Sequence, residues 1–131
     1  MTYIEQGGKE LQFGVGIIVA KGPSVVPTST GNLATVTGTV LITSCYAMVT
    51  TAFTAAATSL DIGTTANPTN IANVATLTSL VVGQYLASPV TPSAPVLAAA
   101  GNITWLASAG NTGQLKVYIV YVPLDAGAGI S

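Results

Sequence analysis

Few side chains in this sequence can do chemistry, and their types restrict which reactions are open to it. The 131 residues include three lysines, four acidic residues and one cysteine, but no histidine. Pairs of a serine or cysteine nucleophile with a histidine base are therefore impossible. A pair of carboxylates for general acid–base catalysis would have to come from Glu5, Glu10, Asp61 and Asp125.

The positions of these carboxylates argue against an active site. Glu5 and Glu10 fall in a short N-terminal arm, and Asp125 falls in a C-terminal tail. Asp61, in "SLDIGTT", is the one acid expected inside the folded body, where its carboxylate accepts backbone N–H bonds at a turn or strand end. The alternative is an oxygen-ligand Ca²⁺ site shared across a symmetry axis, which makes Asp61 the one candidate metal ligand. We predict no enzyme activity, no catalytic residue and no cofactor.

The single cysteine, Cys45, lies between Ser44 and Tyr46 in an apolar run. A lone cysteine rules out an intramolecular disulfide framework and a cysteine-based zinc cluster. Nothing nearby in the sequence would lower the pKa of its thiol, so we predict that Cys45 is a small buried hydrophobic residue.

The low charge of the chain indicates that its surface is in contact with other protein subunits. Only 5% of the residues are charged, against about 25% in an ordinary soluble domain, and half are hydrophobic. Such a surface lacks the repulsion that keeps small domains apart in solution. Three scattered lysines cannot form a phosphate-binding patch, so we expect no nucleic-acid partner. The acidic N-terminus does not resemble a signal peptide, and we expect no export.

The segment Thr37–Thr65 contains a long uncharged run, and its first charged residue is Asp61. Its length would suit a membrane helix of about 20 residues. However, threonines recur through it, and in "TVTGTVLIT" they alternate with Val36, Val40 and Ile42. A period of two belongs to a strand with one face on a core. The segment therefore predicts two or more strands, and we expect no membrane partner.

Further strands are predicted by the same alternation in "QLKVYIVYV", "LQFGVGIIV" and "NITWLAS". The first ends at Pro123, which cannot donate to a ladder. The glycines and asparagine of "ASAGNTGQ" predict a hairpin loop with positive φ before it. Segments rich in chain breakers predict loops at Lys21–Asn32, Thr64–Asn70 and Ala87–Pro95. "NPTNIANVATLTSLV" has helical spacing, but its threonines disfavour a helix.

Together these patterns predict an all-β protein with a single folded domain. We expect residues 11–123 to form a β-sandwich, a jelly-roll-like sandwich or a small barrel of about seven to nine short strands. Residues 1–10 are predicted to be an N-terminal arm that can reach a neighbour, and residues 124–131 a flexible C-terminal tail.

Aromatic residues divide into core and interface candidates. Trp105 and Tyr121 lie on the apolar faces of their predicted strands and belong to the core. Tyr118, Val120 and Val122 share the other face of "QLKVYIVYV", which must be covered either by a second sheet or by a partner subunit. With Tyr3 of the arm, these three are the predicted protein-interface residues.

Two segments, "GTVLITSCYAMVTTAFTAAATSLDIGTT" and "GNITWLASAGNTGQLKVYIVYVPLDAGA", resemble the small all-β decoration or cement proteins of tailed-bacteriophage heads. In that family a "GxVxIT" strand opens the domain, an "xIGTT" turn follows, and a "TGxxKVYxxYxP" hairpin closes it. The resemblance covers about Gly38–Ala128. It implies a virion protein, often a homotrimer, bound to the major capsid protein or other virion proteins. With no signal peptide expected, such a protein would be made in the host cytoplasm. No catalytic or ligand residues come with it.

The leading expectation is therefore a structural virion protein that decorates or cements a phage capsid as a homo-oligomer. One alternative is a glycan-binding module at the tip of a fibre or adhesin. A second alternative is a building block of a tail tube or filament, which would form open-ended polymers.

Overall fold

The computed structural model describes residues 3–6, 9–12, 16–54, 59–74, 81–84, 95–110 and 112–131. Every regular element in these ranges is a β-strand. The strands are β1 (Tyr3–Gln6), β2 (Lys9–Gln12), β3 (Ile17–Val25), β4 (Gly31–Thr37), β5 (Val40–Thr51), β6 (Leu60–Thr64), β7 (Ala72–Val74), β8 (Val96–Ala98), β9 (Gly101–Ala107), β10 (Gln114–Pro123) and β11 (Gly129–Ile130). The predicted all-β class is confirmed.

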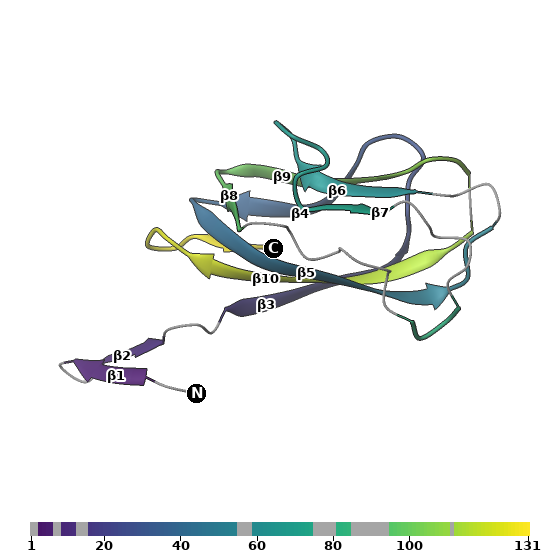
Figure 1. The fold of residues 1–131 in the computed structure, drawn as a ribbon. Helices are drawn as coiled ribbons and strands as arrows, with labels where there is room; N and C mark the ends of the chain where they lie inside the picture. The colour runs from purple at the N-terminus through teal and green to yellow at the C-terminus, as the bar shows by residue number, and fades with distance from the viewer. Residues whose placement is uncertain are drawn as a thin grey trace.

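The strands form two larger antiparallel sheets that face each other, and one separate pair. The four-stranded sheet has the order β3-β10-β5-β8, and the five-stranded sheet the order β11-β4-β9-β6-β7. β1 and β2 pair only with each other. Both larger sheets curl, and they enclose the core between them (Figure 1). This is the small sandwich-like architecture that the alternation predicted.

The chain passes from one sheet to the other at almost every connection. Within the two larger sheets, β6 and β7 are the only consecutive described strands that pair directly. The central pair of the four-stranded sheet joins Tyr46 on β5 to Tyr118 on β10, far apart in the sequence. Pairing of this kind closes long loops and slows folding.

One such crossing explains the pattern in residues 35–43. β4 ends at Thr37 in the five-stranded sheet, and β5 begins at Val40 in the four-stranded sheet. Gly38, with φ 68°, makes the turn between them. The predicted alternation is confirmed across this turn, because Val36 and Ile42 are buried and Thr37 is exposed.

The core is apolar and is drawn from the inner faces of both sheets. Trp105 and Tyr121 are both 6% exposed, as their positions on apolar strand faces predicted. The largest fully buried side chains are those of Val26, Val40, Ile42, Val49, Leu60, Ile62, Ile71, Ile103, Leu115, Val117 and Ile119.

Threonine hydroxyls support two irregularities in the pairing of β5 with β10. The register shifts directly after Gln114 and again directly after Val120. Thr50 Oγ1 donates a hydrogen bond to the carbonyl of Gln114 at 3.2 Å, and Thr43 Oγ1 donates one to the carbonyl of Val120 at 3.3 Å. A shift of this kind disrupts the ladder locally, and each hydroxyl supplies a donor at that point.

The connection between β9 and β10 is not the predicted hairpin. β9 belongs to the five-stranded sheet and β10 to the four-stranded sheet, so the chain crosses the sandwich between Ala107 and Gln114. Gly110 and Gly113 do not have positive φ, and Asn111 lies outside the described residues. Gly113 is required for space instead, since a Cβ there would collide with the ring of Phe53.

The N-terminal third also departs from the predicted segments. The strand expected over residues 11–19 is divided between β2, which ends at Gln12, and β3, which begins at Ile17. The loop expected at Lys21–Asn32 is shorter, because β3 continues to Val25. β3 is an edge strand of its sheet and pairs only with β10. Such a strand can accommodate Pro23, because a residue on its unpaired side does not need to donate a backbone hydrogen bond.

The C-terminal segment 124–131, expected as a flexible tail, is tied to the five-stranded sheet. β11 pairs with β4, and Ile130 is buried. Ser131 and Thr35 exchange two backbone hydrogen bonds, with N···O distances of 2.8 and 2.9 Å. The segment with helical spacing, residues 67–81, contains the strand β7. Its residues 75–80 lie outside the described part of the chain.

Replacing Thr43 or Thr50 with valine removes a hydroxyl while keeping a similar shape. Since a partly buried carbonyl then loses its donor, we expect each change to lower the free energy of unfolding by about 1 kcal/mol in urea denaturation. Thr37→Val on the exposed face of β4 is the matched control, with an expected change within about 0.5 kcal/mol. Equal losses in all three variants would contradict the assigned role.

Cys45 is fully buried, as predicted, and desolvation raises the pKa of its thiol from 9.0 to about 12. The unfolded-state thiol ionises near pH 9.0 while the folded one stays protonated until about pH 12. We therefore expect its contribution to stability to be constant below pH 9 and to fall by about 1.4 kcal/mol per pH unit between these values. The measurement is the difference in unfolding free energy between the wild type and Cys45→Ala from pH 7 to 11. A difference that does not change with pH would contradict this placement.

Candidate protein-binding surface

β10 carries apolar side chains on both of its faces, and the described residues cover one of these faces. Leu115 and Ile119 are fully buried in the core. Tyr118 and Val120 alternate with them and point to the opposite side, where they are half-buried. No described strand lies over that side of the four-stranded sheet (Figure 1). The face of Tyr118 was predicted to be covered either by a second sheet or by a partner subunit. The described residues do not provide a second sheet there.

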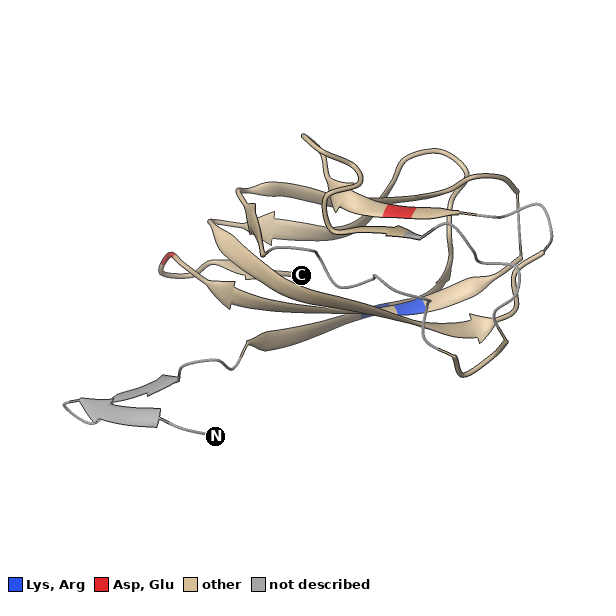
Figure 2. Cartoon of the chain, in the orientation of Figure 1, with Lys and Arg blue, Asp and Glu red and all other residues tan. Residues whose placement is uncertain are grey.

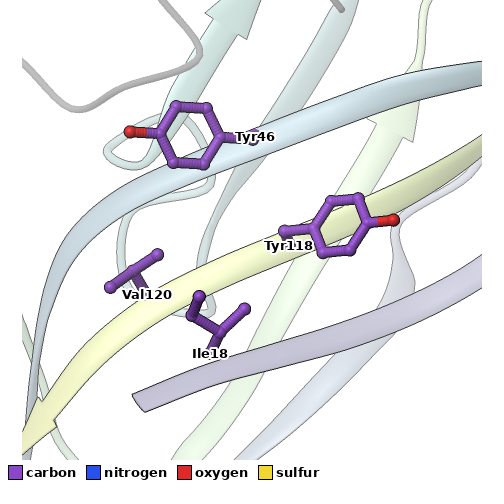
Figure 3. Close-up of a pocket in the computed structure, with 4 residues that line it drawn as sticks. All are labelled: Ile18, Tyr46, Tyr118 and Val120. Atoms are coloured by element: carbon purple, nitrogen blue, oxygen red, sulfur yellow. The ribbon is translucent and has the colours of Figure 1, made fainter. Parts of the chain in front are cut away.

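The exposed side of this sheet holds an open groove of about 560 Å³. Four side chains from three adjacent strands line it, namely Ile18 of β3, Tyr46 of β5, and Tyr118 and Val120 of β10 (Figure 3). The strand register places Tyr118 beside Tyr46 and Val120 beside Ile18. Ile18 is 64% exposed and Tyr46 is 44% exposed. We call these four residues the apolar groove.

The apolar surface continues past the groove toward the other edge of the sheet. Val122 is the register partner of Leu41, which in turn pairs with Leu97 of β8. Leu97 is 65% exposed. Val122 thus lies on the predicted face but does not line the groove. The side chain of Tyr3 lies outside those that the structure describes.

The charges of the described side chains are distributed unevenly around the groove. Lys116 is on the same face of β10 as Tyr118, with its Nζ 5.6 Å from the centre of the Tyr118 ring, a cation–π contact. Lys21 of the neighbouring strand β3 is the register partner of Val117, which is fully buried, so it lies on the inner face of this sheet and not beside the groove. The two described carboxylates lie elsewhere, Asp61 on β6 and Asp125 in the turn after β10 (Figure 2). Among the described side chains, Lys116 is therefore the charge that borders the groove.

Asp61 and Asp125 both have structural partners. The carboxylate of Asp61 accepts a hydrogen bond at 2.5 Å from the side-chain amide of Asn73, its register partner on β7. A backbone N–H partner was expected for Asp61. Such a partner is found for Asp125, whose carboxylate accepts a hydrogen bond from the backbone N–H of Thr39 at 3.0 Å. Within the described ranges, no group of three or more acidic, histidine or cysteine residues comes together as a metal site.

Other kinds of chemistry find little support in the described residues. Cys45 is enclosed in the core and cannot meet a substrate there. Across the ranges that the structure describes, no helix is both long and apolar enough to span a membrane. The apolar groove is therefore the feature with the clearest capacity to bind something.

Sequence reasoning identified half of the groove. Tyr118 and Val120 were found because they stand out on the second face of an alternating strand. Tyr46 and Ile18 were missed, because their faces depend on how β5 and β3 pair with β10. Alternation around Cys45 and Ala47, both buried, was the available signal for Tyr46.

The groove and its surroundings are therefore the structural starting point for a function. No protein-family model, no curated protein and no solved structure matches this sequence.

Proposed function

We propose that this protein is a structural virion protein that decorates or cements a phage capsid as a homo-oligomer. The observation that carries the proposal is the apolar groove, which lies on a face of the four-stranded sheet that no described strand covers. A contiguous exposed apolar patch on a small domain is typical of a protein interface. Strands that are apolar on both faces are ordinarily buried on both faces.

The make-up of the apolar groove supports a protein partner. Interface centres are rich in tyrosine and poor in charge, and their energy is concentrated in a few well-packed aromatic anchors. Tyr46 and Tyr118 are register partners and two of the four residues that line the groove, and Lys116 lies beside Tyr118. The chain as a whole has little charge to oppose association.

The resemblance of Gly38–Ala128 to phage-head decoration proteins directs the proposal to a capsid. In this proposal the homo-oligomer, with a trimer favoured, sits on the lattice of the major capsid protein. The outer face of the five-stranded sheet, with exposed Thr35 and Asn102, faces solvent. Neutral polar side chains suit a surface that stays in water.

A glycan-binding tip module is a second candidate, because two adjacent tyrosine rings in an open groove can stack on sugar rings. A glycan array with and without a chelator distinguishes the two. Binding that is lost in Tyr46→Ala would favour the glycan module, and no binding to any glycan would leave the structural proposal ahead.

Lysine substitutions in the groove test the interface directly. We expect the wild type to sediment as a closed oligomer. Ile18→Lys or Tyr46→Lys should weaken association by about 1.5 kcal/mol or more, which is over tenfold. The reason is that each variant places a charge where the oligomer buries an apolar side chain. Thr35→Lys and Thr37→Lys, on the exposed face of the other sheet, are the matched controls and should sediment as the wild type does. A monomeric wild type, or groove variants that associate normally, would contradict the proposal.

Mass spectrometry of purified virions tests the virion assignment itself. We expect the particle to contain this chain in a fixed ratio to the number of copies of the major capsid protein. Its absence from the particles would refute the assignment. Open-ended polymers of the purified protein in negative stain would instead favour the tail-tube or filament alternative.

A further inference from the structure

The outermost strands of the two larger sheets differ in length. β7 and β8 have three residues each and β11 has two, whereas β3 has nine. A short edge strand offers few unpaired backbone groups, and natural proteins use short edges to prevent pairing between sheets. Among the strands that the structure describes in the two larger sheets, β3 is therefore the one long edge.

The two edges of the four-stranded sheet also differ in their backbone partners. Along β5, on the side of β8, Val49 accepts a hydrogen bond from the backbone N–H of Gly83 at 2.8 Å and donates one to the carbonyl of Gln84 at 2.9 Å. β3 pairs with β10, and no described strand pairs with its other side (Figure 1). Residues of an antiparallel strand direct their backbone groups to alternate sides, so every second residue of β3 directs them away from its own sheet.

The two halves of β3 differ in sequence. Residues 17–20 contain no charge, proline or glycine. Ile17 and Ile18 lie on opposite faces, and each is exposed, by 49% and 64%. The other half contains Lys21 and Pro23, two residue types that oppose pairing at an edge. The half of β3 that begins at Ile17 is therefore the part that can accept a further strand.

This half of β3 is complementary to a second copy of itself. When two copies lie antiparallel about a two-fold axis at Ile18, the two Ile18 side chains face each other and Ile17 faces Val19. Opposite residues of an antiparallel pair share a face, so each apolar side chain meets an apolar side chain. Lys21 and Pro23 then lie beyond the paired residues, 16–20. An axis at Val19 would instead place Lys21 opposite Ile17.

We infer that β3 is a self-association edge, through which two copies of this protein join their four-stranded sheets into one continuous sheet. The interface is isologous, because the same strand contributes both sides of it. The axis is perpendicular to the sheet, so both apolar grooves open on the same side, and each reaches the junction through Ile18.

This contact is additional to the proposed contact through the groove. It uses backbone groups at the rim of the sheet and leaves the outer face free to bind the capsid or another copy. Because a two-fold axis cannot relate two members of a ring of three, the edge joins copies that belong to neighbouring rings when the groove builds a trimer.

Lysine substitution on β3 tests the edge. Ile17 does not line the groove, and Val25, at the far end of the strand, is exposed to the same extent, 48%. Ile17→Lys should weaken the two-fold contact by about tenfold or more, because a charge then faces an apolar side chain. Val25→Lys, beyond Pro23, is the matched control and should associate normally. Sedimentation of both variants in a Tyr46→Lys background keeps the groove contact out of the measurement. Equal dimerisation of the two would show that the edge is wrongly assigned.

Amide hydrogen exchange, followed by NMR in the wild-type chain, tests the backbone pairing itself. In the dilute monomer, every second amide of residues 17–20 faces water and should exchange rapidly. In the associated protein all of these amides should be protected. Packing of side chains on the outer face alone would not produce this change, because it supplies no acceptors at the rim of the sheet.

The outcomes separate this inference from the proposed oligomer. If alternate amides of residues 17–20 exchange equally fast in the associated and dilute protein, the inference is overturned while the groove contact stands. A chain that is monomeric at every concentration would overturn both. A monomeric chain whose amides become protected only on added capsids would place a strand of another virion protein at this edge, and would likewise overturn the pairing of two copies.

Discussion

A sheet has two faces, and the described strands of this protein cover only one face of its four-stranded sheet. The inner face is closed by the five-stranded sheet, while the outer face presents tyrosine, isoleucine and valine to solvent. The cost of exposing such a surface is about 25 cal/mol per Å² of apolar area, and association removes it. The groove and the scarcity of charge both have a physical reason in this constraint.

The two outer faces of the sandwich differ in a way that suits one-sided attachment. On the five-stranded sheet, exposed positions hold Asn32, Thr35, Thr37, Asn73 and Asn102. On the four-stranded sheet, the corresponding face holds the apolar groove and Leu97. Apart from Asp61, the polar side chains that keep this face wet are neutral. The other face is left for contact with protein.

Local pattern predicted the elements of this fold better than their partners. Period-two alternation located β5, β9 and β10 and the buried positions of Trp105 and Tyr121, because a half-buried strand imposes that period on the sequence itself. It could not say which sheet each strand joins. The loop before β10 suits a hairpin locally, yet β10 pairs with β3 and β5, and only tertiary pairing decides this. For the same reason Tyr118 and Val120 were predicted as interface residues, whereas Ile18 and Tyr46 were not.

Two departures show tertiary contacts overriding local signals. Chain breakers near Pro23 predicted a loop, but an edge strand absorbs them, because its outer side makes no ladder bonds. The small residues after Pro123 predicted flexibility, but burial of Ile130 and two backbone bonds to Thr35 hold the end of the chain. Neither effect leaves a mark in a short sequence window.

Hydroxyl-radical footprinting of Tyr46 and Tyr118 tests the central claim most directly, since both side chains report on the outer face of the four-stranded sheet. If that face is the interface, both tyrosines should be protected at concentrations where the protein is associated and should become reactive on dilution to the monomer. Equal reactivity in the associated and dilute states would contradict the account, because the apolar face would then remain open to water in the assembly.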